Sequence, residues 1–547
     1  MVSNYGPDMA DADKLLDDWL DAELAHDPVT GSALGLEGYD DRLGDFSAAS
    51  FENRAAEDGR WAGRFDRLTL DDLPFAQRID VTVVLSRLAG RAVVNDWQAW
   101  RRDPSVYLDP CLEGVFTLFL HRLRPETELV AAAVARLGQV SAVLGSARAN
   151  LDPDLASRLL VERGLRAAGA GVRYLRELLP AEVVDDRLRA DLAAAAAHAA
   201  TAVEDFASVL EGLAERARGH WAIGDVNYSG LLKDRVLLGY GASEMHARGL
   251  VAWDELNTEM GDLAATVDPA AGGWREVVTE LATDHPATPA DMRVAYEEVC
   301  GGARQFLIDH DLVTMPDGER CDVVASPLFE RPVLAVASYN APPPFSPSTL
   351  GHFNVPFPPD GASAAEIDQR LADNSHHAIP TTSVHEAYPG HHWQLTWSNR
   401  CDRKIRKVIR TPYFVEGWAL YAERMMHERG FFADPRAALG HVNARIFRAA
   451  RIVVDTALHT GDMTIDQAVD HMVAKAALPL PVARAEVDRY CAWPTQAASY
   501  LTGSIEIERI RDRWMAEGKG SLKEFHDAIA ESPGLPLALA ELALFHA

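Results

Sequence analysis

Apolar residues recur at helical spacing along most of the chain, with polar residues between them. Residues 74–98 show this pattern, and the alanine-rich run 188–217 favours one long helix because alanine has the highest helix propensity. The pattern predicts a mainly α protein. Further helices are predicted at 11–26, 126–146, 153–179, 243–265, 289–308, 364–373, 383–398, 412–429, 435–460, 464–475, 481–492, 494–515 and 521–531.

Residues 316–360 differ from the rest because they are rich in proline and in β-forming residues. Within them, VLAVASY (333–339) and HFNVPF (352–357) are typical of short strands. We expect a small sheet beside the helix at 383–398. The chain therefore divides into a helical N-terminal lobe, 1–315, and a lobe with the candidate chemistry, 316–547, which together form one integrated domain.

Composition narrows the possible partners and location. The formal net charge is −28 and the pI about 5.1, which disfavours binding to nucleic acid or to an anionic membrane. Five widely spaced cysteines without a CxxC motif favour a reducing compartment. The acidic N-terminus does not resemble a signal peptide, and we find no run of about 18 apolar residues. These features predict a cytoplasmic protein.

The stretch VHEAYPGHHWQ, 384–394, is similar to a zinc-hydrolase motif but has a different spacing. In HExxH, two histidines lie one helical turn apart, and the glutamate is a general base. Here His385 and Glu386 are followed by His391 and His392, six and seven residues after His385. On an ideal helix His391 would point about 240° away, and His392 would lie about 10 Å along the axis. A regular helix therefore cannot form a zinc site here.

Pro389 and Gly390 change this expectation. Proline cannot donate a backbone hydrogen bond, and glycine adopts unusual backbone angles at low cost. The pair can therefore force a wide turn or a π-type bulge. A bulge that absorbs two residues brings His391 to the second ligand position, whereas His392 needs three, so we favour His391. Glu386 would then be the general base; the alternative is a helix end with surface histidines.

A third ligand is expected on the predicted helix 412–429. Glu416 and Glu423 are seven residues apart and share one helix face. A glutamate on a buried face is costly unless it is paired or bound to metal. We favour Glu416 as the ligand and Glu423 as the partner that orients a ligand histidine. The alternative is that both are solvated.

The segment 489–500 supplies further candidates. A hydrolase needs a donor aimed at the developing oxyanion, and Tyr490, Tyr500 or Arg489 could provide it. We favour Tyr490, and Gln496 is a candidate for binding substrate. The alternative is that both tyrosines are packing residues.

Three more residues could support the site. Asp455 and His459 are four apart on one predicted helix, where they could orient a ligand, relay protons or form an ordinary polar pair. Tyr339 ends a predicted strand, and an edge strand near the site could hold a substrate in extended form.

Four blocks carry a resemblance to a known family: HEAYPGHHWQ, EGWALYAE, RIVVDTALHT and RYCAWPTQAASYLTG. Together they resemble domain-of-unknown-function family 885, a bacterial family that is similar to gluzincin-type zinc peptidases. The resemblance implies a two-lobed, α-rich metallopeptidase-like fold with the active site in a channel. This chain departs from the family pattern at Thr495, where glycine is usual.

These features predict a zinc-dependent hydrolase of peptide or amide bonds with one Zn²⁺ per chain, held by His385, His391 and Glu416. A deep channel, as the resemblance implies, favours short peptides. One alternative is hydrolysis of a non-peptide amide or ester, and another is an inactive helical binding protein. The oligomeric state is not indicated. The sequence contains no P-loop and no GxSxG elbow.

Overall fold

The computed structural model of the protein describes residues 7–328, 330–331 and 336–546. The chain forms two compact units, one up to Ile223 with Pro343–Pro347, and one of Gly224–Pro342 with the rest from Ser348. The predicted boundary near residue 315 lies inside the second unit. Helices between 224 and 315 belong there because they pack against C-terminal helices such as α20.

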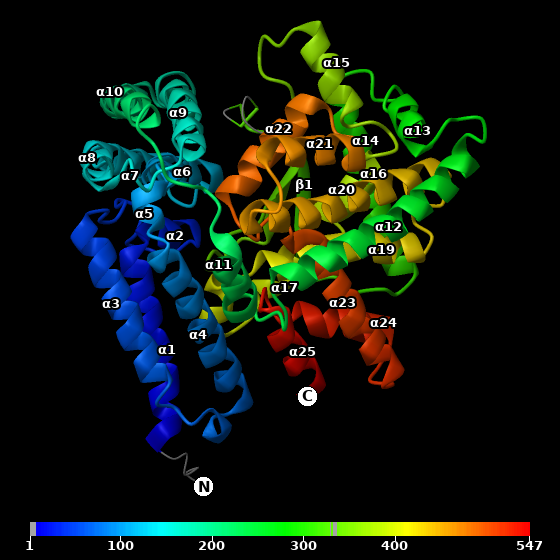
Figure 1. The fold of residues 1–547 in the computed structure, drawn as a ribbon, viewed down its shortest axis with the longest axis horizontal. Coiled ribbons are helices and arrows are strands. Elements are labelled where there is room, and N and C mark those ends of the chain that lie inside the picture. The colour runs from blue at the N-terminus through cyan, green and yellow to red at the C-terminus, as the bar shows by residue number, and fades with distance from the viewer. Residues whose placement is uncertain (1–6, 329, 332–335, 547) are drawn as a thin grey trace. The chain divides into compact units, whose positions relative to one another are not determined.

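The first unit is built from helices around an apolar core (Figure 1). The alanine-rich helix packs against its three preceding helices, as its small side chains allow. The unit contains α1 (Pro7–His26), α2 (Pro28–Ala33), α3 (Ala48–Phe65), η1 (Leu70–Asp72), α4 (Phe75–Asp96), α5 (Ala99–Arg102), α6 (Ser105–His121), α7 (Glu126–Leu137), α8 (Val140–Asn150), α9 (Arg158–Arg173), η2 (Tyr174–Leu178), η3 (Leu179–Glu182) and α10 (Asp186–Ala214).

One segment of this unit differs from the expectation that no membrane-length apolar stretch exists. Glu126–Asn150 is long and apolar enough to cross a membrane by length and composition. It forms two helices, α7 and α8, and Leu129, Val130 and Leu144 are among their residues in the core of the unit. Core helices meet the same criterion, so this packing accounts for the composition.

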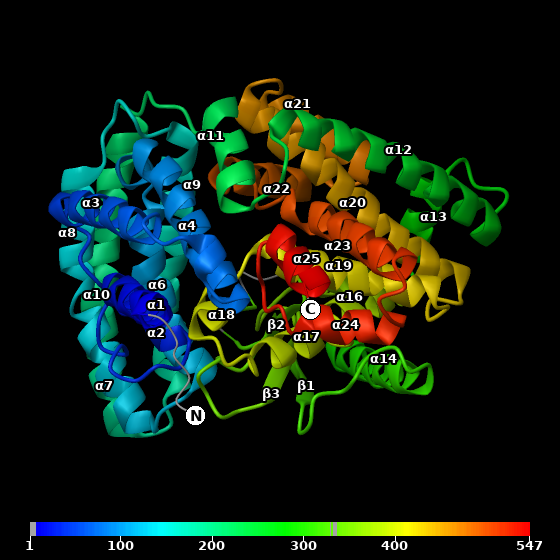
Figure 2. The same ribbon diagram turned by 90° about the horizontal axis from the view of Figure 1, so that it is seen from below.

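The second unit carries the predicted motifs. Its two 26-residue helices, α12 and α20, lie side by side (Figures 1 and 2), and α19 packs against α23. The helices are α11 (Gly224–Gly230), η4 (Leu231–Arg235), α12 (Ala242–Val267), α13 (Trp274–Leu281), α14 (Pro289–Asp309), α15 (Ala364–Ala372), α16 (Ile379–Glu386), α17 (His391–Ser398), α18 (Lys404–Val408), α19 (Pro412–Glu428), α20 (Pro435–Thr460), α21 (Ile465–Ala476), α22 (Leu480–Ala492), α23 (Ser499–Ala516), α24 (Leu522–Ala530) and α25 (Leu537–His546).

A three-stranded sheet of order β1-β3-β2 interrupts this helical unit. β1 (Arg320–Ala325) pairs parallel to β3 (Leu350–Val355), and β2 (Ser338–Asn340) pairs antiparallel to β3. The small sheet is confirmed, but β1 is an additional strand. Part of the predicted strand 333–339 lies outside the described residues, since 332–335 are not described. Helix α14 packs on β1 and β3.

Candidate metal centre

The predicted helix 383–398 is interrupted in the middle of the candidate motif. Helix α16 ends at Glu386 and α17 begins at His391. A cis peptide bond precedes Pro389, and the carbonyl of Pro389 accepts a hydrogen bond from the Trp418 indole at 2.8 Å. The wide turn expected here is a complete break between two helices rather than a bulge within one.

This turn requires glycine at position 390. The Gly390 N–H donates to the carbonyl of Val384 at 3.0 Å, and a Cβ atom at this position would lie 1.9 Å from the carbonyl oxygen of His385. No other residue fits without moving the backbone. The turn brings the rings of His385 and His391 together, with centroids 4.7 Å apart.

Two histidines and one glutamate converge at the turn. The Nε2 atoms of His385 and His391 lie 3.5 and 3.4 Å from Oε2 of Glu416. All three donor atoms lie within 4.8 Å of one another. His385 and His391 are buried, and the Glu416 side chain is 22% exposed. The structure therefore brings together the three residues that the sequence favoured as ligands.

Close packing of two helices positions Glu416. A Cβ atom at Gly417 of α19 would lie 2.6 Å from the backbone of Gly503 on α23, and one at Gly503 would lie 2.0 Å from the carbonyl oxygen of Tyr413. The paired glycines let the two backbones touch, which holds Glu416 and the first turns of α23 at a fixed distance.

A buried carboxylate lies behind the first histidine. Glu423 accepts a hydrogen bond from Nδ1 of His385 at 2.7 Å. Burial raises the pKa of Glu423, but the hydrogen bond with His385 and the nearby His441 outweigh it and lower the pKa to about 2. His441, 3.6 Å from Glu423, is fully buried, and burial lowers its pKa to about 4, so it is neutral at pH 7. His441 has no sequence signal other than being a histidine on an apolar helix face.

Glu386 is a buried acid beside this cluster. Burial raises its pKa, against the attraction of His385 and His391. Its carboxylate also interacts electrostatically with Glu416. A carboxylate with a raised pKa is a stronger base than an ordinary carboxylate, which suits it to accept and return a proton.

His392 is held away from the cluster. Its Nε2 lies 2.8 Å from Glu319, and its Nδ1 lies 2.9 Å from the hydroxyl of Tyr339. Glu319 also accepts hydrogen bonds from Tyr388 and Arg304. Both ring nitrogens of His392 are therefore used, and Tyr339 has a partner other than a substrate. Glu319 precedes β1 and carries no local sequence signal.

Tyr490 does not provide the free donor that the sequence analysis favoured. Its side chain is fully buried, and its hydroxyl donates to Glu486 at 2.6 Å while accepting from Arg451 at 3.1 Å. Arg489 donates to Glu486 and to Gln496. These groups stabilise one another, so Tyr490 and Arg489 serve as packing and ion-pair residues.

Tyr500 is a better-placed hydroxyl. Its oxygen accepts a hydrogen bond from the Gln496 amide at 3.4 Å, which leaves its own proton free to donate. Arg451 lies over the ring, 5.0 Å from its centroid. Tyr500 interacts electrostatically with Glu416, and burial raises its pKa, so the hydroxyl stays protonated.

Asp455 and His459 support the loop before α23. Asp455 accepts hydrogen bonds from the Tyr228 hydroxyl at 2.6 Å and from the Thr495 N–H at 3.1 Å. His459 lies 3.0 Å from the carbonyl of Tyr490. Thr495 lies before α23 rather than inside the predicted helix 494–515, and its φ of 72° is left-handed. Glycine adopts this conformation more easily than other residues, which explains why glycine is usual at this position.

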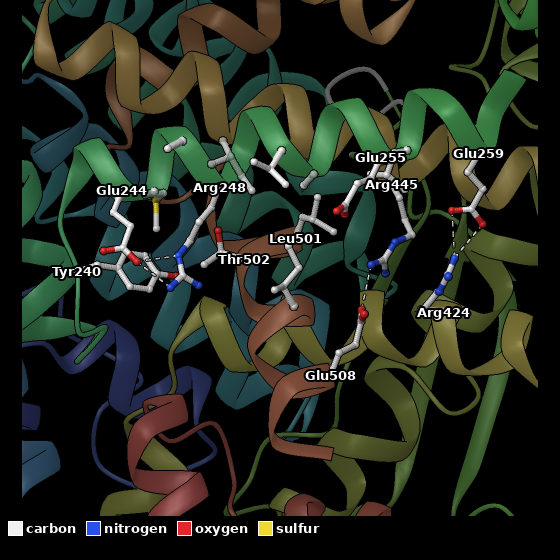
Figure 3. Close-up of a pocket in the computed structure, with 17 residues that line it drawn as sticks. Tyr240, Glu244, Arg248, Glu255, Glu259, Arg424, Arg445, Leu501, Thr502 and Glu508 are labelled. Carbon is white, nitrogen blue, oxygen red and sulfur yellow. Dashed lines mark hydrogen bonds and ion pairs between the residues drawn. The ribbon is translucent and has the colours of Figure 1, made fainter. Parts of the chain in front are cut away.

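A cavity lies in the same unit, between α12, α20 and α23 (Figure 3). It has a volume of about 520 Å³ and none of the three clustered residues lines it. Its arginines are paired: Arg424 with Glu259, Arg445 with Glu508, and Arg248 with Glu244, as the dashed lines show.

The family model for DUF885, described as "Bacterial protein of unknown function", matches residues 28–544. The chain belongs to this family. The match confirms the resemblance carried by the motif blocks. No curated protein matches this DUF885 chain.

Two solved structures share the fold. One is described as "a putative lipoprotein of unknown function from Shewanella oneidensis", with 20% identity, a TM-score of 0.81, and coverage of 98% of this chain and 99% of that chain. The other is "the putative lipoprotein from Colwellia psychrerythraea", with 19% identity, a TM-score of 0.82 and 98% coverage of both chains. At this identity the likeness concerns the fold alone.

Proposed function

We propose that this DUF885 protein is a zinc-dependent hydrolase of peptide or amide bonds that acts on short peptides. The observation that carries the proposal is the convergence of two imidazole nitrogens and one carboxylate oxygen within 4.8 Å. Two histidines and a glutamate form a common catalytic zinc ligand set, which leaves a fourth position open.

The distances and charges fit a zinc ion. Ligand atoms at about 2.05 Å from a tetrahedral zinc lie about 3.3 Å apart, close to the 3.5 and 3.4 Å between Glu416 and the two histidines. The surroundings also favour a cation. Burial lowers the pKa of His385, but hydrogen bonds with Glu416 and Glu423 outweigh it and raise the pKa to about 10.

The other catalytic roles fall to side chains of the protein. When bound, zinc supplies Lewis-acid activation of water and of the scissile carbonyl. Glu386 takes a proton from the attacking water and passes it to the leaving amine. Tyr500, oriented by Gln496, donates a hydrogen bond to the oxyanion, in place of Tyr490.

The likeness to gluzincin-type peptidases and a two-lobed arrangement are part of this proposal. The proposal also includes a cytoplasmic location, which the five free cysteines support. It includes no nucleic-acid or membrane partner, which the net charge of −28 supports.

Metal analysis with three variants tests the proposal. Protein purified without chelator is expected to carry one zinc per chain. His385→Ala and Glu416→Ala should lose the zinc, whereas Glu386→Gln should keep it and lose hydrolysis of a mixed short-peptide library. Wild-type protein that binds no zinc when zinc is in excess would overturn the proposal.

A further inference from the structure

Arg445, Arg448 and Arg451 lie on α20, and Arg489 lies on α22, which packs against α20. Three of them are paired with carboxylates at 2.9 Å: Arg445 with Glu508, and both Arg451 and Arg489 with Glu486. Their charges are satisfied within the protein. The fourth is Arg448.

Arg448 has no carboxylate within 4.0 Å among the residues that the structure describes. Its one hydrogen bond runs from Nη1 to the carbonyl of Ala444, on its own helix, at 3.1 Å. The Nε atom is buried and has no partner in the described part of the chain. A guanidinium whose Nε is buried and unpaired, with no carboxylate in ion-pair contact, is costly, and burial lowers the pKa of Arg448.

The position of Arg448 directs it toward the candidate centre. It is seven residues after His441 and seven before Asp455, so the three share one face of α20. His441 lies beside Glu423, and Asp455 lies under the Thr495 loop. The Arg448 charge interacts with Arg451 and Glu423 and, more weakly, with Tyr500 and Glu416.

We propose that Arg448 binds a carboxylate of the substrate, and that the substrates are short peptides cleaved close to their free carboxyl terminus. The inference rests on the proposed hydrolase function. A guanidinium binds a carboxylate with two parallel hydrogen bonds, and Nε together with Nη2 of Arg448 offers such a pair. The terminal carboxylate is the anion that every unblocked peptide carries. An acidic side chain offers the same group, and the experiment separates the two.

Binding can be measured without turnover in zinc-loaded Glu386→Gln protein. Three N-acetylated tripeptide libraries are used: Ac-Ala-Ala-Xaa as free acids, the same peptides as carboxyl-terminal amides, and Ac-Ala-Asp-Xaa amides. Ultrafiltration followed by mass spectrometry measures which peptides the protein retains. Only the free acids should be retained. Equal retention of free acids and simple amides would overturn the proposal, and preferential retention of the Asp-containing amides would overturn the assignment to the terminus.

Variants of Arg448 assign the effect to its side chain. Adding Arg448→Met should weaken free-acid binding about 10- to 100-fold, and Arg448→Lys should restore part of it. The control, Arg436→Met, changes an exposed arginine at the start of α20 and should bind like the parent. A loss of the same size for acids and amides would overturn the proposal.

Turnover by wild-type protein is measured separately on the same libraries. Free acids that are retained but never cleaved would contradict the hydrolase function while supporting the role of Arg448. Cleavage without any preference for the free acid would support the hydrolase function and overturn the role of Arg448.

Discussion

Glu423 accepts a hydrogen bond from Nδ1 of His385 at 2.7 Å, and its side chain is 1% exposed. This contact determines which ring nitrogen is free, because an ionised carboxylate requires a proton on Nδ1. Nε2 then faces Glu416 and is the nitrogen that would bind a metal ion once it has lost its proton. Buried carboxylates that orient ligand histidines in this way also make them better donors.

Glu423→Gln is therefore expected to weaken zinc binding about 10- to 100-fold, as replacement of such supporting groups does. A neutral amide still fills the space but no longer stabilises the imidazole. Competition with a fluorescent chelator measures the affinity. Glu428→Gln, a more exposed position on the same helix, is the control. Equal affinities for Glu423→Gln and wild type would contradict the role given to Glu423.

The two adjacent histidines should give opposite results. His391→Ala should abolish zinc binding. His392→Ala should keep zinc but lower the free energy of unfolding by about 3 kcal/mol, because it removes a partner from the buried Glu319. Elemental analysis and urea denaturation measure the two effects. Zinc loss in His392→Ala with full retention in His391→Ala would reverse the ligand assignment.

The convergence of His385, His391 and Glu416 could be predicted from sequence because its pattern is local. The Pro-Gly pair follows the first histidine directly, so a turn and the preference for His391 could be derived from spacing alone. Glu416 could be predicted because a glutamate on a buried helix face is costly unless it is paired or bound to metal. The mainly helical fold followed from periodicity in the same way.

Contacts between distant segments could not be predicted. Glu319 lies 73 residues before His392, and no pattern around it indicates that pairing. The geometry does not favour Tyr490 over Tyr500, because Glu486 and Arg451 take up the Tyr490 hydroxyl. These contacts depend on how α20 packs on α22. The sequence pattern extends the predicted helix over Thr495, because the left-handed φ of this residue depends on the loop that Asp455 holds.

Removing each tyrosine hydroxyl tests the revised assignment. Tyr500→Phe should lower kcat on a cleaved peptide about 10²- to 10³-fold with zinc content unchanged, as loss of an oxyanion donor does. Tyr490→Phe removes the same atom from a buried ion-pair network, so it should lower Tm and leave kcat close to wild type. Steady-state kinetics and thermal melts measure both. A large kcat loss confined to Tyr490→Phe would restore the original assignment.

The buried carboxyl of Asp455 should make the free energy of unfolding depend on pH. Burial raises its pKa to about 7, compared with about 3.9 in an unfolded chain. Below about pH 4 the carboxyl is protonated in both states and favours neither. Between about pH 4 and 7 the unfolded state loses this proton first, so the carboxyl increasingly destabilises the folded protein. Above about pH 7 the effect is constant.

Asp455→Asn keeps an oxygen that can accept hydrogen bonds from Tyr228 and Thr495 but cannot ionise. The free energy of unfolding of the variant minus that of wild type should therefore rise between pH 4 and 7, by at most about 1.4 kcal/mol per pH unit. Urea denaturation at half-unit pH steps measures this difference, with Asp462→Asn, at an exposed position, as the matched control. A difference that stays constant, or falls as the pH rises, would contradict a raised pKa, since only a carboxyl that holds its proton more tightly in the folded state produces the rise.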